Sequence, residues 1–312
     1  MLQKDQLIGK YRIKELLGSG GFGKVYRAED TWLKIPVAIK VPHDQHPKLD
    51  EMLCEARLLA SLDHPNIVRV LNSEKTENVF YFVMEYVDGQ SLESILEKEK
   101  TLPLDTFFDY IEKILGAVEY AHKKNILHRD LRPANILISK EGVLKIADFG
   151  ISKDLQNAPF ARTRVGSPPY MAPEQFLGRS VLVSDIYAIG VMMYEMLTGN
   201  LPIYDADINA LQRKAAEGRV TPPEQKNKSI PQRLSRIILK AMAPKIEQRY
   251  PSAEELRKDL LNEGGVKGQY IQIQEIQERL RAKKTSSGVL CWNCRKPMHK
   301  KANVCMHCGE KQ

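Results

Sequence analysis

The sequence predicts an α+β protein with a small β-rich N-terminal lobe, a larger helical C-terminal lobe and a small C-terminal appendage. Short apolar segments bounded by glycines, typical of strands, occupy the first part of the chain, and amphipathic helical patterns dominate from Ser91 onward. Four of the five cysteines lie between positions 291 and 308. A length of 312 residues, with 43% hydrophobic and 28% charged residues, suits two packed lobes plus an appendage.

Three glycines near the N-terminus, Gly18, Gly20 and Gly23, follow a predicted strand over residues 11–17. Glycines at this spacing let the backbone approach phosphates closely, with amide N–H groups facing the ligand. The pattern alone is weak, because it also suits a dinucleotide-binding turn. Residues 25–28 indicate a second strand rather than a helix, which favours a β-hairpin over nucleotide phosphates.

A lysine, Lys40, stands inside the apolar strand predicted over residues 37–41. Such a lysine is costly unless its ammonium has anionic partners, although an edge-strand lysine can also point into water. The next segment, 50–62, has helical periodicity and contains two candidate partners, Glu51 and Glu55.

A buried strand over residues 79–87 leads to Asp88 and Gly89, which mark the boundary between the lobes. From Ser91 the pattern turns helical, and the clearest segment is a long amphipathic helix over residues 104–123.

Three polar residues, Asp130, Asn135 and Asp148, lie around apolar segments after this helix. Apolar residues flank the stretch 128–135, and an apolar strand over 143–147 leads into Asp148. The pattern predicts a loop and a short hairpin that hold the three side chains around one cleft.

Phosphoryl transfer requires such a set of side chains. A carboxylate positions the attacking hydroxyl and accepts its proton, while oxygen ligands hold Mg²⁺ on the phosphates. Asp and Asn are also common in turns, so each motif taken alone has a structural explanation. Both motifs in this order favour the catalytic interpretation.

These motifs, taken in order, resemble those of the eukaryotic-type protein kinases. The phrases at 173–175 (Pro-Glu-Gln) and 249–252 (Arg-Tyr-Pro-Ser) are most similar to the prokaryotic branch of serine/threonine kinases. The resemblance covers roughly residues 8–263 and implies the bilobal protein-kinase fold, with an N-lobe over about 8–87 and a C-lobe over about 88–263.

The resemblance also implies roles for individual residues. The expected catalytic residues are Asp130 as the base, Lys40 on the α- and β-phosphates, Glu55 as the helix partner of Lys40 with Glu51 as the fallback, and Arg132. Met84 would lie behind the adenine, and the backbone of Glu85 and Val87 would bond the base. The full nucleotide-binding set is Gly18, Gly20, Gly23, Val25, Ala38, Lys40, Met84, Glu85, Val87, Asn135 and Asp148. Asn135 and Asp148 would hold Mg²⁺ (or Mn²⁺) beside ATP.

Two positions depart from the common serine/threonine pattern. Arg132 replaces the usual Lys, and a planar bidentate Arg is not equivalent to it. Ser167 stands where Thr is more usual, and its hydroxyl is expected to bond Asp130 and the nearby cation. Pro133 and the segment 166–171 still resemble the serine/threonine class, so the acceptor is expected to be a protein Ser or Thr.

The segment between Gly150 and Ala172 is the expected activation loop. Within it, Thr163 is the best candidate for an activating phosphate, with Arg129 as its partner. Autophosphorylation of this loop is also expected. Further on, Asp185 is expected to cap the N-terminus of an apolar helix and, by resemblance, to anchor the catalytic-loop backbone.

Two more residues, Glu174 and Arg249, have a supporting role. By resemblance they form a buried ion pair, and neither is expected to be catalytic.

The last part of the chain divides into a linker over 264–288, with a helical pattern at 270–284, and a predicted zinc ribbon over 289–312. Two C-x-x-C pairs, Cys291 with Cys294 and Cys305 with Cys308, are typical of a structural Zn²⁺ site. His299 and His307 are substitute ligands, and two disulfides are the alternative.

Charge is concentrated in this tail. Residues 264–312 carry ten Lys and Arg against three Glu, which is +7 of the chain's net +8. This favours an acidic partner of the tail, either a protein or a nucleic acid, although the charge could simply keep the tail soluble.

The sequence therefore predicts an ATP-dependent serine/threonine protein kinase with a regulatory or partner-binding zinc ribbon. The alternatives are a pseudokinase scaffold, disfavoured because all the expected catalytic residues are present, and a kinase whose basic tail binds nucleic acid. Neither a transmembrane span nor a signal peptide is expected, so the predicted location is the cytoplasm.

Overall fold

The computed structural model describes residues 2–20, 23–43, 56–76, 79–149, 167–261, 289–298 and 303–311. The chain divides into two compact units, Met1–Leu260 and Leu261–Gln312, and each is considered by itself. Several predictions fall outside the described residues: Glu51, Glu55, Thr163, His299 and the helical pattern at 270–284.

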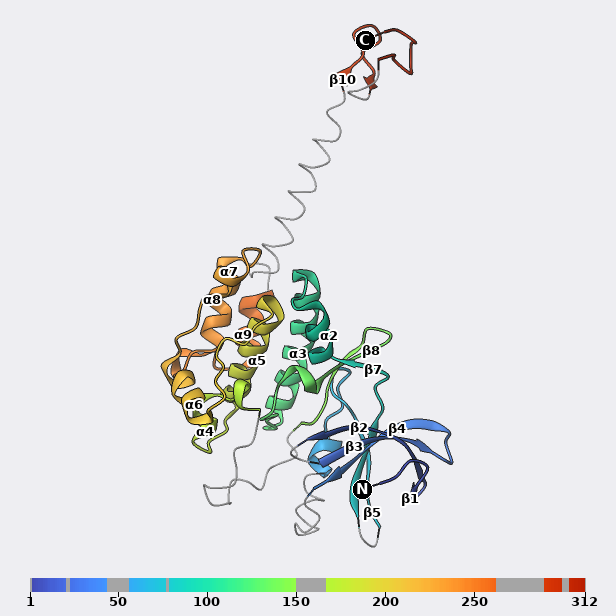
Figure 1. Ribbon diagram of the computed structural model, residues 1–312, viewed down its shortest axis with the longest axis vertical. Coiled ribbons are helices and arrows are strands. Elements are labelled where there is room, and N and C mark those ends of the chain that lie inside the picture. The colour runs from blue at the N-terminus through green and yellow to red at the C-terminus, as the bar shows by residue number, and fades with distance from the viewer. Residues whose placement is uncertain are drawn as a thin grey trace. The chain divides into compact units, whose positions relative to one another are not determined.

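The first unit begins with a six-stranded antiparallel sheet in the order β1-β2-β3-β4-β6-β5 (Figure 1). Its strands are β1 (Leu7–Ile8), β2 (Tyr11–Gly20), β3 (Gly23–Asp30), β4 (Ile35–Pro42), β5 (Val70–Lys75) and β6 (Phe80–Glu85). The predicted glycine hairpin is confirmed, since β2 pairs with β3 up to the Gly20–Gly23 register. Gly23 has φ of +155°, and a Cβ there would lie 2.4 Å from the carbonyl oxygen of Val41, so only glycine fits.

The sheet packs around an apolar core supplied by alternating positions of its strands. The buried members of this core are Ile8, Tyr11, Ile13, Tyr26, Ala28, Val37, Ile39, Tyr81 and Val83. Strand β6 is buried at five consecutive positions, as expected of a central strand, and it carries the chain to the lobe boundary. Residues 56–60 are helical, within the segment where a helix is predicted.

The second lobe is mainly helical. Its helices are α2 (Leu92–Glu99), α3 (Leu104–Lys123), α4 (Pro173–Phe176), α5 (Leu182–Thr198), α6 (Ile208–Glu217), α7 (Pro223–Lys226), α8 (Gln232–Ala241) and α9 (Ala253–Leu261). Short 3₁₀ turns lie at Pro133–Asn135, Pro168–Tyr170 and Ile246–Gln248. Helix α3 has the predicted bounds, and α5 packs against α3 and α8 at the centre of the lobe. Because α5 is apolar on all sides, it is buried along nearly its whole length.

The expectation that Asp185 caps helix α5 is wrong. The helix begins at Leu182, with Val181 as the preceding residue, and Asp185 lies inside the first turn. Its carboxylate is buried and accepts hydrogen bonds from another segment, which the candidate site below explains.

A small three-stranded sheet lies beside these helices in the order β7-β8-β9. Its strands are β7 (Gly89–Ser91), β8 (Ile136–Ser139) and β9 (Leu144–Ile146). The antiparallel β8–β9 pair is the short hairpin predicted from the sequence, and it separates Asn135 from Asp148 along the chain while keeping their strands side by side.

The second unit is small. Its described part contains the two-stranded pair β10 (Val289–Leu290) and β11 (Pro297–Met298), together with a bridge between Val304 and Lys311. Cys291 and Cys305 are the buried residues of its core, with Cys294 packed against them. Among the helices that the structure describes, none is both long and apolar enough to cross a membrane.

Candidate active site

The loop between α3 and β8 is fixed by one buried carboxylate, that of Asp185. Asp185 accepts the backbone N–H of His128 and of Arg129, each at 2.9 Å, and contacts His122 Nε2 at 2.8 Å. Burial raises the pKa of Asp185, but its bonds to His122 and to the His128 amide outweigh burial, so the net pKa lies below the usual value. The predicted anchoring of this loop by Asp185 is confirmed.

The backbone of Arg129 is fixed from both sides. Its φ is +71°, a conformation that costs about 1–3 kcal/mol in a residue other than glycine. Asp185 accepts its N–H, and the side-chain amide of Gln175 donates to its carbonyl at 3.1 Å. These two bonds hold the strained residue next to Asp130.

Both carboxylate oxygens of Asp130 accept hydrogen bonds. Its Oδ1 accepts the backbone N–H of Ser167 at 2.8 Å, and its Oδ2 accepts Asn135 Nδ2 at 3.2 Å. Asn135 Nδ2 also donates to the Asp130 carbonyl at 2.7 Å. The expectation that the Ser167 hydroxyl bonds Asp130 is wrong, since the Ser167 amide makes that bond. The expectation that the hydroxyl bonds the nearby cation is confirmed, because it accepts from Arg132 Nη1 at 2.8 Å.

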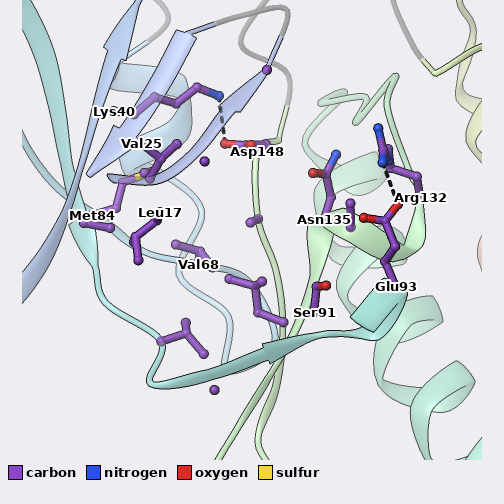
Figure 2. Close-up of a pocket in the computed structure, with 18 of the residues that line it drawn as sticks. Leu17, Val25, Lys40, Val68, Met84, Ser91, Glu93, Arg132, Asn135 and Asp148 are labelled. Atoms are coloured by element: carbon purple, nitrogen blue, oxygen red, sulfur yellow. Dashed lines mark hydrogen bonds and ion pairs between the residues drawn. The ribbon is translucent and has the colours of Figure 1, made fainter. Parts of the chain in front are cut away.

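Asp148 also adopts a positive φ, +61°, and directs one oxygen at Lys40. Lys40 Nζ lies 2.8 Å from Asp148 Oδ1, as the dashed line in Figure 2 shows. Lys40 is 2% exposed in β4, so its buried charge is compensated by this partner. His128 Nε2 donates to the carbonyl of Ala147 at 2.8 Å, which ties the loop to the end of the hairpin.

These side chains open into one cleft between the two lobes, with a volume of about 1030 Å³. All members of the predicted site that the structure describes line it: Gly18, Gly20, Gly23, Val25, Ala38, Lys40, Met84, Glu85, Val87, Asp130, Arg132, Asn135 and Asp148. The lining combines the glycine hairpin, apolar side chains such as Val25 and Met84, and the charged groups of Lys40, Asp130 and Asp148. The geometry suits an elongated ligand with a flat apolar end and an anionic end.

Comparisons with known proteins agree with this geometry. Residues 11–261 match the family model described as "Protein kinase domain". The chain belongs to the protein kinase family.

Curated relatives come from several bacteria. The kinase chain is 36% identical to a protein of Clostridium acetobutylicum named "Probable serine/threonine-protein kinase", over 86% of this chain and 42% of that protein. It is 35% identical to serine/threonine-protein kinase PrkC of Bacillus subtilis, over 83% and 41%. With serine/threonine-protein kinase PknB of Mycobacterium leprae the identity is 34%, over 84% and 44%. The chain thus spans about two fifths of the length of these relatives.

The hinge of the kinase domain is fixed by polar contacts at its edge. Glu85 Oε1 accepts the backbone N–H of Arg69 at 2.7 Å and the ammonium of Lys145 at 2.8 Å. Met84 is buried at the back of the cleft, opposite Ala38 in the strand register. These contacts position the backbone of residues 85–87 along the apolar end of the cleft.

The residues present fit a nucleotide and a divalent cation. Gly23 leaves no space for a side chain on the glycine hairpin, and Gly18 and Gly20 leave that wall open. Because Asn135 Nδ2 is engaged by Asp130, its carbonyl oxygen remains for a ligand, and Asp148 has a second oxygen beside the one that meets Lys40. Oxygen donors of this kind are what Mg²⁺ prefers.

The supporting ion pair between Glu174 and Arg249 is present as expected. Arg249 donates two bonds to the carboxylate of Glu174, at 2.7 and 2.8 Å, and its side chain is fully buried. Ser184 Oγ donates to the same carboxylate at 2.6 Å. Burial raises the pKa of Glu174, but the bonds from Arg249 and Ser184 lower it by more than burial raises it. The net pKa therefore lies below the usual value, and the carboxylate stays charged.

Three residues of the site network are not in the sequence prediction: His122, Gln175 and Glu93. Glu93 Oε1 accepts Arg132 Nη2 at 2.7 Å (Figure 2). Gln175 lies in the Pro-Glu-Gln phrase that supports the family resemblance, and that phrase is the sequence signal that could have identified it. His122 and Glu93 stand on amphipathic helices, where a polar residue is ordinarily assumed to face solvent.

The four C-terminal cysteines also meet. Their Sγ atoms all lie within 4.8 Å of one another, with 3.6 Å between Cys291 and Cys308 and 3.6 Å between Cys294 and Cys305. Four thiolates around Zn²⁺ at about 2.3 Å form a tetrahedron with edges of about 3.8 Å. The cluster therefore fits a four-thiolate zinc ion, with all positions supplied by the protein.

Proposed function

We propose that this chain is an ATP- and Mg²⁺-dependent serine/threonine protein kinase that transfers the γ-phosphoryl group to protein hydroxyls. The observation that carries the proposal is the convergence of Asp130, Asn135, Asp148 and Lys40 on one cleft beneath a glycine hairpin. The names of the bacterial relatives support the serine/threonine class.

Asp130 is the proposed base. Its carboxylate is oriented by the Ser167 amide and the Asn135 side chain, so it meets the acceptor hydroxyl in a fixed geometry and can accept the proton that leaves it. Mg²⁺, when bound, neutralises charge on the phosphates. Asn135 and Asp148 would hold it through the oxygens named above.

Lys40 is proposed to bind the α- and β-phosphates. Its ammonium stands 2.8 Å from Asp148 with little exposure to water, so its charge acts in a medium that screens it weakly. Met84, together with the backbone of Glu85 and Val87, would position the adenine, as Val25 and Ala38 line the same apolar end.

Several finer assignments remain predictions. The role of Glu55 as partner of Lys40, the activating phosphate on Thr163 and autophosphorylation concern residues outside the described part of the chain. The domain limits of 8–263, 264–288 and 289–312 and the cytoplasmic location also stay predictions.

For the tail we propose a structural Zn²⁺ held by Cys291, Cys294, Cys305 and Cys308. Exposed apolar side chains beside these ligands, Trp292 and Met306, support a role in binding a partner protein. Nucleic-acid binding by the basic tail remains the alternative, and a steep salt dependence would be its mark.

The proposal is tested by incubating the protein with labelled ATP, Mg²⁺ and a mixture of Ser-, Thr- and Tyr-containing acceptor proteins. Label on Ser or Thr with the wild type is expected. Asp130→Asn, which preserves shape but removes the base, should lose at least about 100-fold in rate. Nucleotide binding without transfer by the wild type would favour the pseudokinase scaffold instead, and label on Tyr would contradict the acceptor class.

A further inference from the structure

Three residues form a wall shared by two cavities. Glu93, Arg132 and Ser167 line the nucleotide cleft, and the same three line a second, adjoining cavity of about 520 Å³. The second cavity is bounded further by Pro168, Tyr170 and other residues of the C-lobe. The wall therefore stands where the nucleotide compartment meets the adjoining surface of the C-lobe.

Arg132 is the middle of this wall, and its guanidinium is fixed at both ends. Nη2 donates to Glu93 Oε1 at 2.7 Å, and Nη1 donates to Ser167 Oγ at 2.8 Å. Its Nε is shielded from solvent and has no hydrogen-bond partner among the described residues. A planar fork with two anchored nitrogens has one orientation, whereas the ammonium of a Lys at this position could turn freely.

Glu93 is itself placed by the start of helix α2. Ser91 caps this helix by accepting the backbone N–H of Ser94 at 3.1 Å, and Leu92 and Leu96 are buried beneath it. Glu93 lies in the first turn, where a carboxylate is favoured by the helix dipole. The position of its side chain is therefore set by a rigid element and not by a loop.

The same contacts link Glu93 to the proposed base. Arg132 meets Ser167 through the hydroxyl, and Ser167 meets Asp130 through the amide. Within the described residues, Arg132 forms its ion pair with Glu93, and Asp130 receives amide donors instead. Glu93 and Ser167 thus engage both Nη atoms of Arg132, while amide donors orient the carboxylate of Asp130.

We propose that Glu93 is a positioning residue for phosphoryl transfer: it fixes the Arg132 guanidinium between the two cavities so that the second N–H groups of Nη1 and Nη2 face the transferring phosphoryl group. This inference rests on the proposed kinase function. It explains how this chain uses Arg where Lys is more usual, because the guanidinium of Arg132 bonds Glu93 on α2 in addition to Ser167.

A purely structural role would look different. Glu93 and Arg132 side chains are 44% and 31% exposed, and ion pairs with that exposure contribute little to stability. A loss of Glu93 should therefore leave the thermal midpoint of the kinase domain nearly unchanged while lowering the rate of the chemical step.

The test compares Glu93→Ala, Glu93→Gln and Glu99→Ala in the full chain, measuring kcat and KM for ATP with the acceptor that the wild type labels best. Glu99 lies on the same helix, is exposed, and lines neither cavity, so its variant is the matched control. Glu93→Ala should lower kcat about 10-fold or more with KM for ATP nearly unchanged, because small misplacements of a catalytic group are costly. Glu93→Gln keeps an accepting oxygen and should recover most of that rate.

A second pair separates action through Arg132 from any other route. In an Arg132→Ala background, the further change Glu93→Ala should have no additional effect on the residual rate. Three results would each overturn the positioning role while the kinase function stands. The first is a kcat of Glu93→Ala equal to that of the wild type, and the second is a Glu93→Gln variant as slow as Glu93→Ala. The third is a Glu93→Ala change that lowers kcat as much in the Arg132→Ala background as it does in the wild type. A wild type that transfers no phosphate would overturn both.

Discussion

The two units of this protein build their sites in opposite ways. In the kinase domain, the candidate catalytic residues rest on a core of side chains other than the proposed ligands: α5 is buried almost throughout, and Asp185 within it fixes the loop that carries Asp130. In the C-terminal unit, the buried residues of the described core are Cys291 and Cys305, which are themselves the proposed metal ligands.

This difference has a physical consequence. A fold that supports its site can lose a catalytic side chain and remain folded, because the side chain contributes little to the core. A unit whose core consists of its ligands gains most of its folding free energy from the metal. We therefore expect the kinase domain to remain folded without its ligands, and the C-terminal unit to depend on the proposed metal for its folding.

The largest effect is expected in the ribbon. Replacing Cys291 and Cys305 by Ser in the full chain should abolish stoichiometric zinc binding, measured by elemental analysis. The lost folding free energy corresponds to about 10 kcal/mol or more, the usual scale for structural zinc sites. Glu310→Gln, which changes only a side chain in the same unit and keeps the backbone bond from Cys305 to residue 310, is the control and should retain one zinc per chain. Full zinc content in the double Cys variant would show that other groups hold the metal.

A smaller but still large effect is expected at the anchor of the catalytic loop. Asp185→Asn keeps the shape of the side chain but replaces one accepting oxygen by an NH₂ group. This group would face the backbone N–H of His128 or Arg129, so one buried donor loses its acceptor. Breaking such a buried, paired charge costs about 3–5 kcal/mol. Denaturant unfolding should show this loss, with kcat reduced as well.

The matched control is Asp109→Asn on α3, whose carboxylate meets Lys113 at 2.8 Å and is 54% exposed. It should change the free energy of unfolding by no more than about 0.5 kcal/mol, as exposed pairs do. Equal losses in the two variants would mean that burial of Asp185 does not determine its contribution.

The smallest effect concerns pH. Asp185 and Glu174 both have pKa values lowered in the folded kinase domain, by hydrogen bonds that outweigh burial. Their stabilising contribution is therefore fully present above their unfolded pKa values, near 4, and is lost as pH falls through the lower folded values. Unfolding free energy should decline below about pH 4 in the wild type and decline less in Asp185→Asn. An equal acid-dependent decline in both proteins would contradict the assignment to Asp185.

Much of the kinase domain was predictable from the sequence because its elements are periodic. The glycine hairpin, the strand of Lys40 and the bounds of α3 follow from alternation and helical spacing over long stretches. The residues that meet at the cleft were predictable only through family motifs, since no local pattern brings Asp148 to Lys40 across 108 positions.

Two expectations of side-chain hydrogen bonding differ from the structure. That Asp185 caps its own helix follows from the local hydrogen bonding that is usual for Asp near a helix start, but the backbone amides of His128 and Arg129 occupy its carboxylate. The resemblance implies that the Ser167 hydroxyl bonds both Asp130 and the nearby cation. In the structure the hydroxyl bonds the cation, Arg132, while the Ser167 amide bonds Asp130. Glu93 is not in the sequence prediction, because its partner lies 39 positions away in sequence.

The most direct test of the contrast between the two units is hydrogen exchange of the full chain, followed by mass spectrometry, before and after zinc is removed with a chelator. We expect peptides from 289–298 and 303–311 to lose protection, while peptides from α3, α5 and the β8–β9 hairpin keep theirs. Retained protection in the ribbon peptides would contradict a metal-built fold. Lost protection in the kinase domain would contradict its independence from the metal.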